Sequence, residues 1–183
     1  MKKNNDFYLS QEIIDLGKKI TELSNNEFEY GIGIDEKGNI LEAITSKERK
    51  VIYIPIEYVK KINNGSFIHN HPESFSFSLP DFILAHKSKC KIYAKVLNSS
   101  QKQKEGFYIF IDAHKQNRQK ISILFEKFFK LEQSKLYRRA KKGDKIDYDK
   151  ENKNLEHKVW KKIKKRTNII YLWIGIDNEN RNS

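Results

Sequence analysis

The chain of 183 residues is poor in cysteine, proline and long apolar runs. Cys90 is its single cysteine, so no disulfide forms within the chain and no metal site can be built from several thiolates. No apolar run approaches the ~20 residues of a membrane-spanning helix. The start, Met1-Lys2-Lys3, leads into polar residues rather than the apolar core of a signal peptide. These absences predict a cytoplasmic protein without a membrane span.

Charged and aromatic side chains are abundant instead. Eleven Phe, nine Tyr and two Trp occur in a chain of which 33% is charged. This composition is typical of a globular protein with enough apolar material for one core, and it excludes a disordered chain.

The positive charge is unevenly distributed along the chain. Residues 113–168 hold nineteen Lys or Arg against seven Asp or Glu, which equals the whole formal net charge of +12. An excess of one sign in one segment predicts an acidic partner, such as nucleic acid, an acidic protein or a membrane surface. Basic residues that cluster beside aromatic ones are candidates for binding phosphate groups: Arg138, Arg139, Lys161, Lys162, Lys164 and Lys165. An equally strong interpretation is a solvated basic face on helices that bury their aromatic side chains.

Hydrophobic periodicity predicts a mixture of helices and strands in the first part of the chain. The expected helices cover residues 10–23, 55–62 and 78–89, and the expected strands cover 28–34, 40–45, 51–54, 66–69, 91–97 and 107–111. Such a mixture indicates an α+β fold, a mixed β-sheet packed by helices, over residues 1–112. Residues 113–183 are predicted to form a basic helical extension that ends in a strand and packs on this core.

The residues that carry chemistry lie in a short run, 69–81, which reads His-Asn-His-Pro-Glu-Ser-Phe-Ser-Phe-Ser-Leu-Pro-Asp. Residues i and i+2 of a strand point the same way, so His69 and His71 are expected to aim two imidazoles at one point. Asp81 brings a carboxylate from the start of the next helix. Two histidines and one carboxylate, with a fourth position left for water, are the ligand set of a catalytic zinc site.

The same residues also have a structural interpretation. A His-x-His pair alone is a weak signal, because most such pairs are surface or packing histidines. The run Ser78-Leu79-Pro80-Asp81 is typical of a helix N-terminus, with Ser78 as the N-cap and Asp81 completing a capping-box arrangement. The two interpretations are compatible, because a capped helix start can present a metal ligand as well.

These residues resemble a known family. His69-Asn70-His71-Pro72, followed after five residues by Ser78-x-x-Asp81, resembles the signature of JAMM (JAB1/MPN/Mov34) metalloproteases, in particular the prokaryotic type found in phages and mobile elements. RadC-type proteins share the His-Asn-His-Pro core with a longer spacer. The resemblance covers about residues 27–112 and is specific in residues 69–81.

The resemblance implies a fold, a reaction and a set of roles. The fold would be the α/β/α arrangement of JAMM and cytidine-deaminase-like domains. The reaction would be zinc-dependent hydrolysis of an isopeptide or peptide bond in a protein or peptide substrate, including ubiquitin-like conjugates. His69, His71 and Asp81 would bind Zn²⁺, and Ser78 would help to hold the developing oxyanion.

The family also requires a glutamate on an early strand as the base. Glu29 is the preferred candidate and Glu27 the alternative, because both are expected on one face of the strand 28–34. A third interpretation makes both of them solvated charges at the start of that strand. Two further functions stay open: an inactive JAMM- or RadC-like module that holds nucleic acid, and a toxin-like effector protease of a mobile element.

Overall fold

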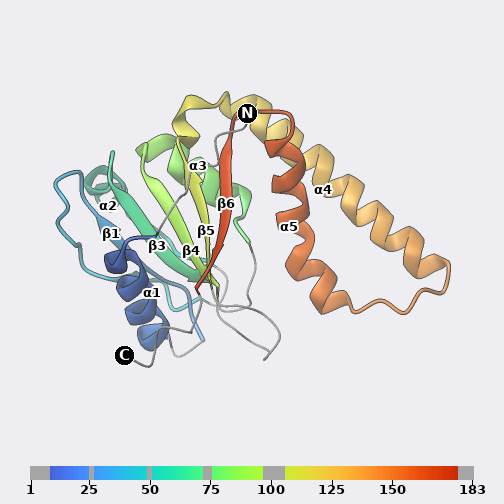
Figure 1. Cartoon of the computed structure of the whole chain (residues 1–183), viewed down its shortest axis with the longest axis horizontal. Coiled ribbons are helices and arrows are strands. Elements are labelled where there is room, and N and C mark those ends of the chain that lie inside the picture. The colour runs from blue at the N-terminus through green and yellow to red at the C-terminus, as the bar shows by residue number, and fades with distance from the viewer. Residues whose placement is uncertain (1–8, 25–26, 49–50, 72–75, 97–105, 177–183) are drawn as a thin grey trace.

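The computed structural model describes residues 9–24, 27–48, 51–71, 76–96 and 106–176, and these form three layers (Figure 1). The elements follow one another as α1 (Gln11–Ser24), β1 (Tyr30–Ile34), β2 (Ile44–Thr45), α2 (Ile56–Lys61), β3 (Ser66–His71), α3 (Leu79–Ser88), β4 (Lys91–Val96), β5 (Gly106–Ile111), the 3-10 turn η1 (Ala113–Lys115), α4 (Arg118–Lys141), α5 (Tyr148–Lys164) and β6 (Ile170–Gly175). The predicted α+β class is confirmed. No helix of the described residues is long and apolar enough to cross a membrane.

The sheet has six strands in the order β2-β1-β3-β4-β5-β6. β3 and β4 run parallel, with α3 between them in the chain, and every other neighbouring pair is antiparallel. β3 therefore lies inside the sheet, hydrogen-bonded on both sides. Its residue His69 is opposite Gly31 of β1 and Ala94 of β4. Pairing on both edges fixes the directions in which the side chains of β3 point.

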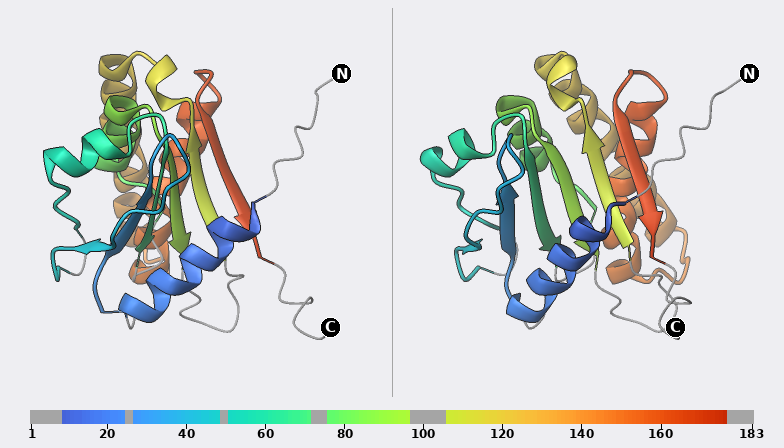
Figure 2. Two further views of the ribbon diagram at one scale, coloured as in Figure 1. Left: turned by 90° about the vertical axis from the view of Figure 1, so that its left-hand side faces the viewer. Right: turned by 60° about the vertical axis from the view of Figure 1, so that its left-hand side comes forward.

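Helices cover both faces of the sheet (Figure 2). On one face α1 packs Ile13, Leu16 and Ile20 against the sheet. On the other face α3, α4 and α5 supply a larger core in which Phe82 and Trp160 are fully buried. Each large apolar side chain buried in this way contributes roughly 1.5–3 kcal/mol to folding. The candidate metal ligands belong to this second, more aromatic side.

Residues 113–176 join the same sheet and the same core as the earlier part of the chain. β6 pairs along its length with β5. Trp160 of α5 lies edge-on to Phe110, with ring centroids 4.7 Å apart, and its Nε1 donates a 2.6 Å hydrogen bond to the carbonyl oxygen of Phe77. Beyond the sheet, the α4–α5 pair extends outward as a helical hairpin (Figure 1).

Several predicted element starts are confirmed by their caps. The Oγ of Ser10 accepts a hydrogen bond from the backbone N–H of Ile13 at the start of α1. Ser78 caps α3, and Pro55 occupies the N-cap position of α2. These starts were predictable because capping depends on neighbours within one turn of the chain.

The predictions for the strands at the sheet edge were partly wrong. Residues 51–54 form no strand, because the Ser46 hydroxyl group binds their backbone in place of a neighbouring strand. This hydroxyl donates to the carbonyl of Val51 and accepts from the N–H of Tyr53. The hairpin partner expected over 40–45 is a strand only at Ile44–Thr45. β1 begins at Tyr30 rather than at residue 28, so Glu27 and Glu29 lie ahead of it.

Candidate metal centre

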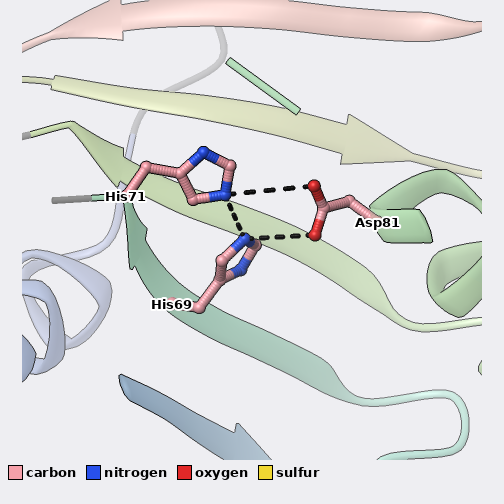
Figure 3. Close-up of side chains that lie close together, drawn as sticks. All are labelled: His69, His71 and Asp81. Carbon is pink, nitrogen blue, oxygen red and sulfur yellow. Dashed lines mark hydrogen bonds and ion pairs between the residues drawn. The ribbon is translucent and has the colours of Figure 1, made fainter. Parts of the chain in front are cut away.

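His69, His71 and Asp81 converge on one point (Figure 3). The two histidine Nε2 atoms are 2.8 Å apart. Nε2 of His69 lies 3.2 Å from Oδ1 of Asp81, and Nε2 of His71 lies 3.9 Å from Oδ2. This is the one group of three or more His, Cys, Asp or Glu side chains at metal-binding separations within the described residues.

These separations fit a small tetrahedral ion. Ligands at 2.0–2.1 Å from zinc place neighbouring donor atoms roughly 3.3 Å apart. The observed separations of 2.8, 3.2 and 3.9 Å bracket that value. Two imidazoles and one carboxylate are hard-to-borderline donors that suit zinc and leave a fourth position for water or substrate. The three side chains are therefore compatible with a bound divalent ion.

The alternation of β3 explains why the two histidines share a face. Phe67, His69 and His71 point to the side covered by α3, while Asn70 between them points to the other. The ring of His69 stacks on Phe67 with centroids 5.5 Å apart, and Phe77 closes the other side at 6.0 Å. His69 is 2% exposed and His71 is 6% exposed. Packed aromatic neighbours thus fix the orientation of the first imidazole.

The N-terminus of α3 fixes the carboxylate. Oδ2 of Asp81 accepts hydrogen bonds from both the backbone N–H and the hydroxyl of Ser78, each 2.7 Å long. In return, Oγ of Ser78 accepts from the backbone N–H of Asp81 at 3.4 Å. This capping box leaves Oδ1 of Asp81 facing His69. The predicted helix cap and the predicted metal ligand therefore share one set of hydrogen bonds. In this structure the Ser78 hydroxyl, as part of the cap, orients the Asp81 carboxylate.

The charges in the group reinforce one another. Burial lowers the pKa of His69, but the adjacent Asp81 carboxylate outweighs this effect, with a contribution from Glu29, and raises that pKa above its ordinary value. Burial raises the pKa of Asp81, but the nearby imidazoles and Ser78 more than compensate and hold it well below its usual range. Both shifts have one cause, the attraction between the Asp81 carboxylate and the protonated form of the neighbouring imidazole.

One atom of the group has no partner. Nδ1 of His69 is buried and meets no hydrogen-bond acceptor or donor among the described residues. A metal on Nε2 places the remaining proton on Nδ1. A buried N–H without an acceptor costs about 1–3 kcal/mol. We therefore expect weaker metal binding than at a site where a carbonyl or carboxylate receives that proton.

Glu29 lies beside the group. It lines the same cleft as His69, His71, Ser78 and Asp81, whereas Glu27 is exposed in a turn. The side chain of Asn70 binds the backbone on both sides of Glu29: its Oδ1 accepts from the N–H of Tyr30 at 2.7 Å, and its Nδ2 donates to the carbonyl of Phe28 at 3.1 Å. The residue between the two histidines thus fixes the position of the chain at Glu29.

A third carboxyl group, Glu156 of α5, also lines this cleft. Burial and the nearby charges of Asp81 and Glu29 raise the pKa of Glu156 to about 8. The sequence interpretation missed this residue because α5 was assigned to a basic extension that packs on the core and not to the site. A signal was present: Glu156 precedes Trp160 by four residues, and residues i and i+4 of a helix share a face.

No family model matches this chain, and no curated protein or solved structure matches it either. The resemblance of residues 69–81 to the JAMM signature therefore depends on those residues and on the geometry they adopt.

The predicted basic residues divide into two kinds. Arg139 is paired with Asp144 and Glu151, Lys162 is paired with Glu132, and Lys164 donates to the carbonyl of Tyr171. By contrast, Arg138, Lys161 and Lys165 are exposed and take part in no ion pair within the part of the chain that the structure describes. Half of the predicted phosphate-binding candidates are therefore committed to intramolecular contacts.

A longer basic surface runs along α4, and of its members only Arg138 was among the basic residues predicted from the sequence clusters. We call it the α4 basic face: Lys120, Lys127, Lys130, Arg138 and Lys141, all exposed. Steps of three, seven and eleven residues stay on one side of a helix, so these five share one face. At 1.5 Å per residue they cover roughly 30 Å. None is in an ion pair with any described residue, and Glu132, an acidic residue of the same helix, lies on the buried side.

Proposed function

We propose that this protein is a zinc-dependent hydrolase of amide bonds, a metallopeptidase or isopeptidase of the JAMM-like α/β/α type. The observation that carries the proposal is the convergence of His69, His71 and Asp81, whose donor atoms lie within 4.8 Å of one another on the wall of a cleft. A buried donor set of this kind, open to a cleft on one side, favours a catalytic rather than a structural role.

The residues around the ion would have distinct roles. His69, His71 and Asp81 would hold zinc, which when bound lowers the pKa of water toward neutrality and polarises a carbonyl group. Glu29 would accept the proton of the attacking water and deliver it to the leaving amine. Ser78 keeps the carboxylate of Asp81 in place. The resemblance implies that this hydroxyl would donate to the developing oxyanion, and for that it would have to release Oδ2 of Asp81, because a hydroxyl carries a single proton.

The test is hydrolysis by the purified, zinc-loaded protein. Peptide and isopeptide substrates, including a ubiquitin-like conjugate, are incubated with the native chain, the His71→Ala variant and the Asp81→Ala variant. Cleavage by the native chain and its loss in both variants is the expected result. A matched control is His114→Ala, since His114 lies outside the cleft. Equal cleavage by the native chain and the Asp81→Ala variant would refute the proposal.

The α4 basic face favours a second function, the binding of a polyanion such as nucleic acid. Five exposed cations over roughly 30 Å match the spacing of several backbone phosphates. This function does not need the metal and is compatible with an inactive module as well as with a hydrolase. Strongly salt-dependent binding by a protein that cleaves no amide bond would favour the inactive module.

A further inference from the structure

The metal-ligand group opens into a cleft of about 810 Å³ whose other walls are mainly apolar. One wall is the chain before and within α2, including Ile52, Ile54 and Ile56. Phe129 of α4 and Leu155 of α5 also line the cleft. Ile56 is 66% exposed, so the structure leaves apolar surface open beside the candidate metal site. This surface is continuous with that site rather than separate from it.

Helix α3 sets an order along the cleft. Asp81, Leu84 and Lys87 all line it, because residues spaced by three or four share one face of a helix. Asp81 stands at the metal end, Leu84 follows one turn later, and Lys87 comes about 9 Å beyond Asp81 along the helix axis. The ammonium group of Lys87 is in no ion pair with any described residue, and its side chain is exposed.

The charges of the cleft are therefore polarised. Among the described lining residues, the carboxyl groups of Glu29, Asp81 and Glu156 lie near one another at the metal end. Among the same described residues, Lys87 is the single lysine or arginine of the lining. A ligand that complements this arrangement is apolar along its length and carries a negative charge at the Lys87 end. An extended chain advances about 3.3 Å per residue, so about three residues cover the distance from Asp81 to Lys87.

We propose that this cleft binds an extended peptide segment with apolar side chains and a carboxylate about three residues from the bond held at His69, His71 and Asp81. This inference rests on the proposed function, since it assigns the substrate of the same site. It names the carboxylate of an aspartate or glutamate side chain, or of a chain terminus, as the group recognised by Lys87. The segment would lie along α3, with its apolar side chains against Leu84 and Ile56.

Binding to the metal-free protein tests the cleft separately from catalysis. A fluorescent peptide of apolar residues, with aspartate as its third residue, is titrated with the full chain. Binding is followed by the fluorescence anisotropy of the peptide. Because an ion pair at an exposed site contributes up to about 1 kcal/mol, Lys87→Glu should weaken binding about fivefold or more. The same variant should bind the peptide with lysine in place of aspartate better than the native chain does.

Two controls separate the contributions. Lys19→Glu makes the same charge change on α1, on the other face of the sheet, and should leave the affinity unchanged. Ile56→Ser removes an exposed apolar wall residue without opening the core and should weaken binding of every apolar peptide. Peptides with an amidated or a free C-terminus, each with or without the aspartate, distinguish a side-chain carboxylate from a terminal one.

The outcomes distinguish this inference from the proposed function. If no apolar peptide binds, or if Lys87→Glu alters neither affinity nor charge preference, the cleft assignment is overturned, whatever the protein hydrolyses. If binding follows the expected charge preference but the zinc-loaded protein cleaves none of the bound peptides, the hydrolase proposal fails while the cleft assignment stands.

Discussion

The cleft and the α4 basic face carry charge in opposite ways. In the cleft, Asp81 and the two histidines are largely buried, and each lies within 4 Å of another member of the group. On α4, five exposed cations face away from the core and pair with no described residue. Charges out of water interact strongly over a few ångströms, whereas exposed charges are screened beyond about 8–10 Å at physiological salt.

Because of this difference, the cleft is the region suited to chemistry and the α4 basic face is the region suited to attracting a charged partner. The net charge of +12 comes from residues 113–168, whereas the proposed chemistry would depend on a few side chains that add little to it. Substitutions in the cleft should therefore abolish zinc binding or hydrolysis, because each member of the group fixes the others. Substitutions on α4 should reduce polyanion binding by degrees, because the exposed cations act nearly independently. The predictions that follow test this contrast, from the largest expected effect to the smallest.

Glu29→Gln should keep zinc and lose hydrolysis. Glutamine fills the same space but cannot accept the proton of the attacking water, and general-base catalysis of this kind contributes about 10²–10⁴-fold to the rate. The measurement is kcat for a cleaved peptide, beside the zinc content of both proteins. The matched control is Glu27→Gln, an exposed residue in the turn before β1. Normal kcat in the Glu29 variant, with loss in the Glu27 variant, would exchange the two assignments.

Asn70→Ala should lower kcat by about 10- to 100-fold while leaving zinc affinity nearly unchanged. The variant loses both hydrogen bonds that fix the backbone around Glu29, and misplacement of a catalytic group by about 1 Å can cost that much. Zinc affinity, KM and kcat are measured separately. A parallel loss of zinc and activity would show that Asn70 supports the whole strand rather than the position of Glu29.

Zinc should stabilise the protein more in mildly alkaline than in mildly acidic solution. The raised pKa of His69 means that its pairing with Asp81 stabilises the metal-free fold fully below the ordinary histidine value of 6.5, and that this is lost as pH rises through the raised pKa. The lowered pKa of Asp81 gives a contribution that is present above 3.8 and is lost as pH falls toward the lowered value.

Metal binding has the opposite dependence on His69, because it needs neutral imidazoles. At a free zinc concentration of about 100 times Kd, the expected rise in Tm is about 5–10 °C near pH 8. The rise should be much smaller near pH 5.5, where protons compete for the same nitrogens. Thermal unfolding with zinc and with a chelator at both pH values measures this. A larger zinc effect in the acidic sample would contradict the assignment of the histidines as ligands.

Removal of two cations from the α4 basic face should weaken polyanion binding by degrees. The Lys127→Ala/Arg138→Ala variant should bind a DNA or RNA duplex with a slope of log K against log salt that is smaller by about two than that of the native chain. Lys162→Ala is the contrasting variant, because Lys162 is paired with Glu132. It should alter stability rather than the salt slope. Equal slopes for the native chain and the double variant would remove α4 from the interface.

The sequence predicted those parts of the site that depend on near neighbours. The alternation of β3 and the cap of α3 each need only a few consecutive residues, so His69, His71, Ser78 and Asp81 were predictable together. Val51–Ile54 was predicted as a strand and is not one, because strand formation requires a partner, and there the Ser46 side chain takes up the backbone instead. Val51, Ile52 and Ile54 of this run line the cleft.

The remaining members of the site depend on contacts between distant segments. Glu156 reaches the cleft because α5 packs through Trp160 onto the chain before α3. The division of the basic residues into paired and exposed sets depends on how α4 meets α5, since Glu132 of one helix binds Lys162 of the other. Basic residues that are close together in the sequence, such as the four lysines in 161–165, are easily recognised as a cluster, whereas the α4 basic face is spread over 21 residue steps at helical spacing.

The most direct test of the account is the zinc content of the purified protein. The native chain and the His114→Ala variant should each hold about one zinc ion per chain after dialysis. The His69→Ala variant should retain almost none, because it leaves only His71 and Asp81 as ligands. Equal zinc content in the His69→Ala variant and the native chain would contradict the claim that these three side chains form the metal centre.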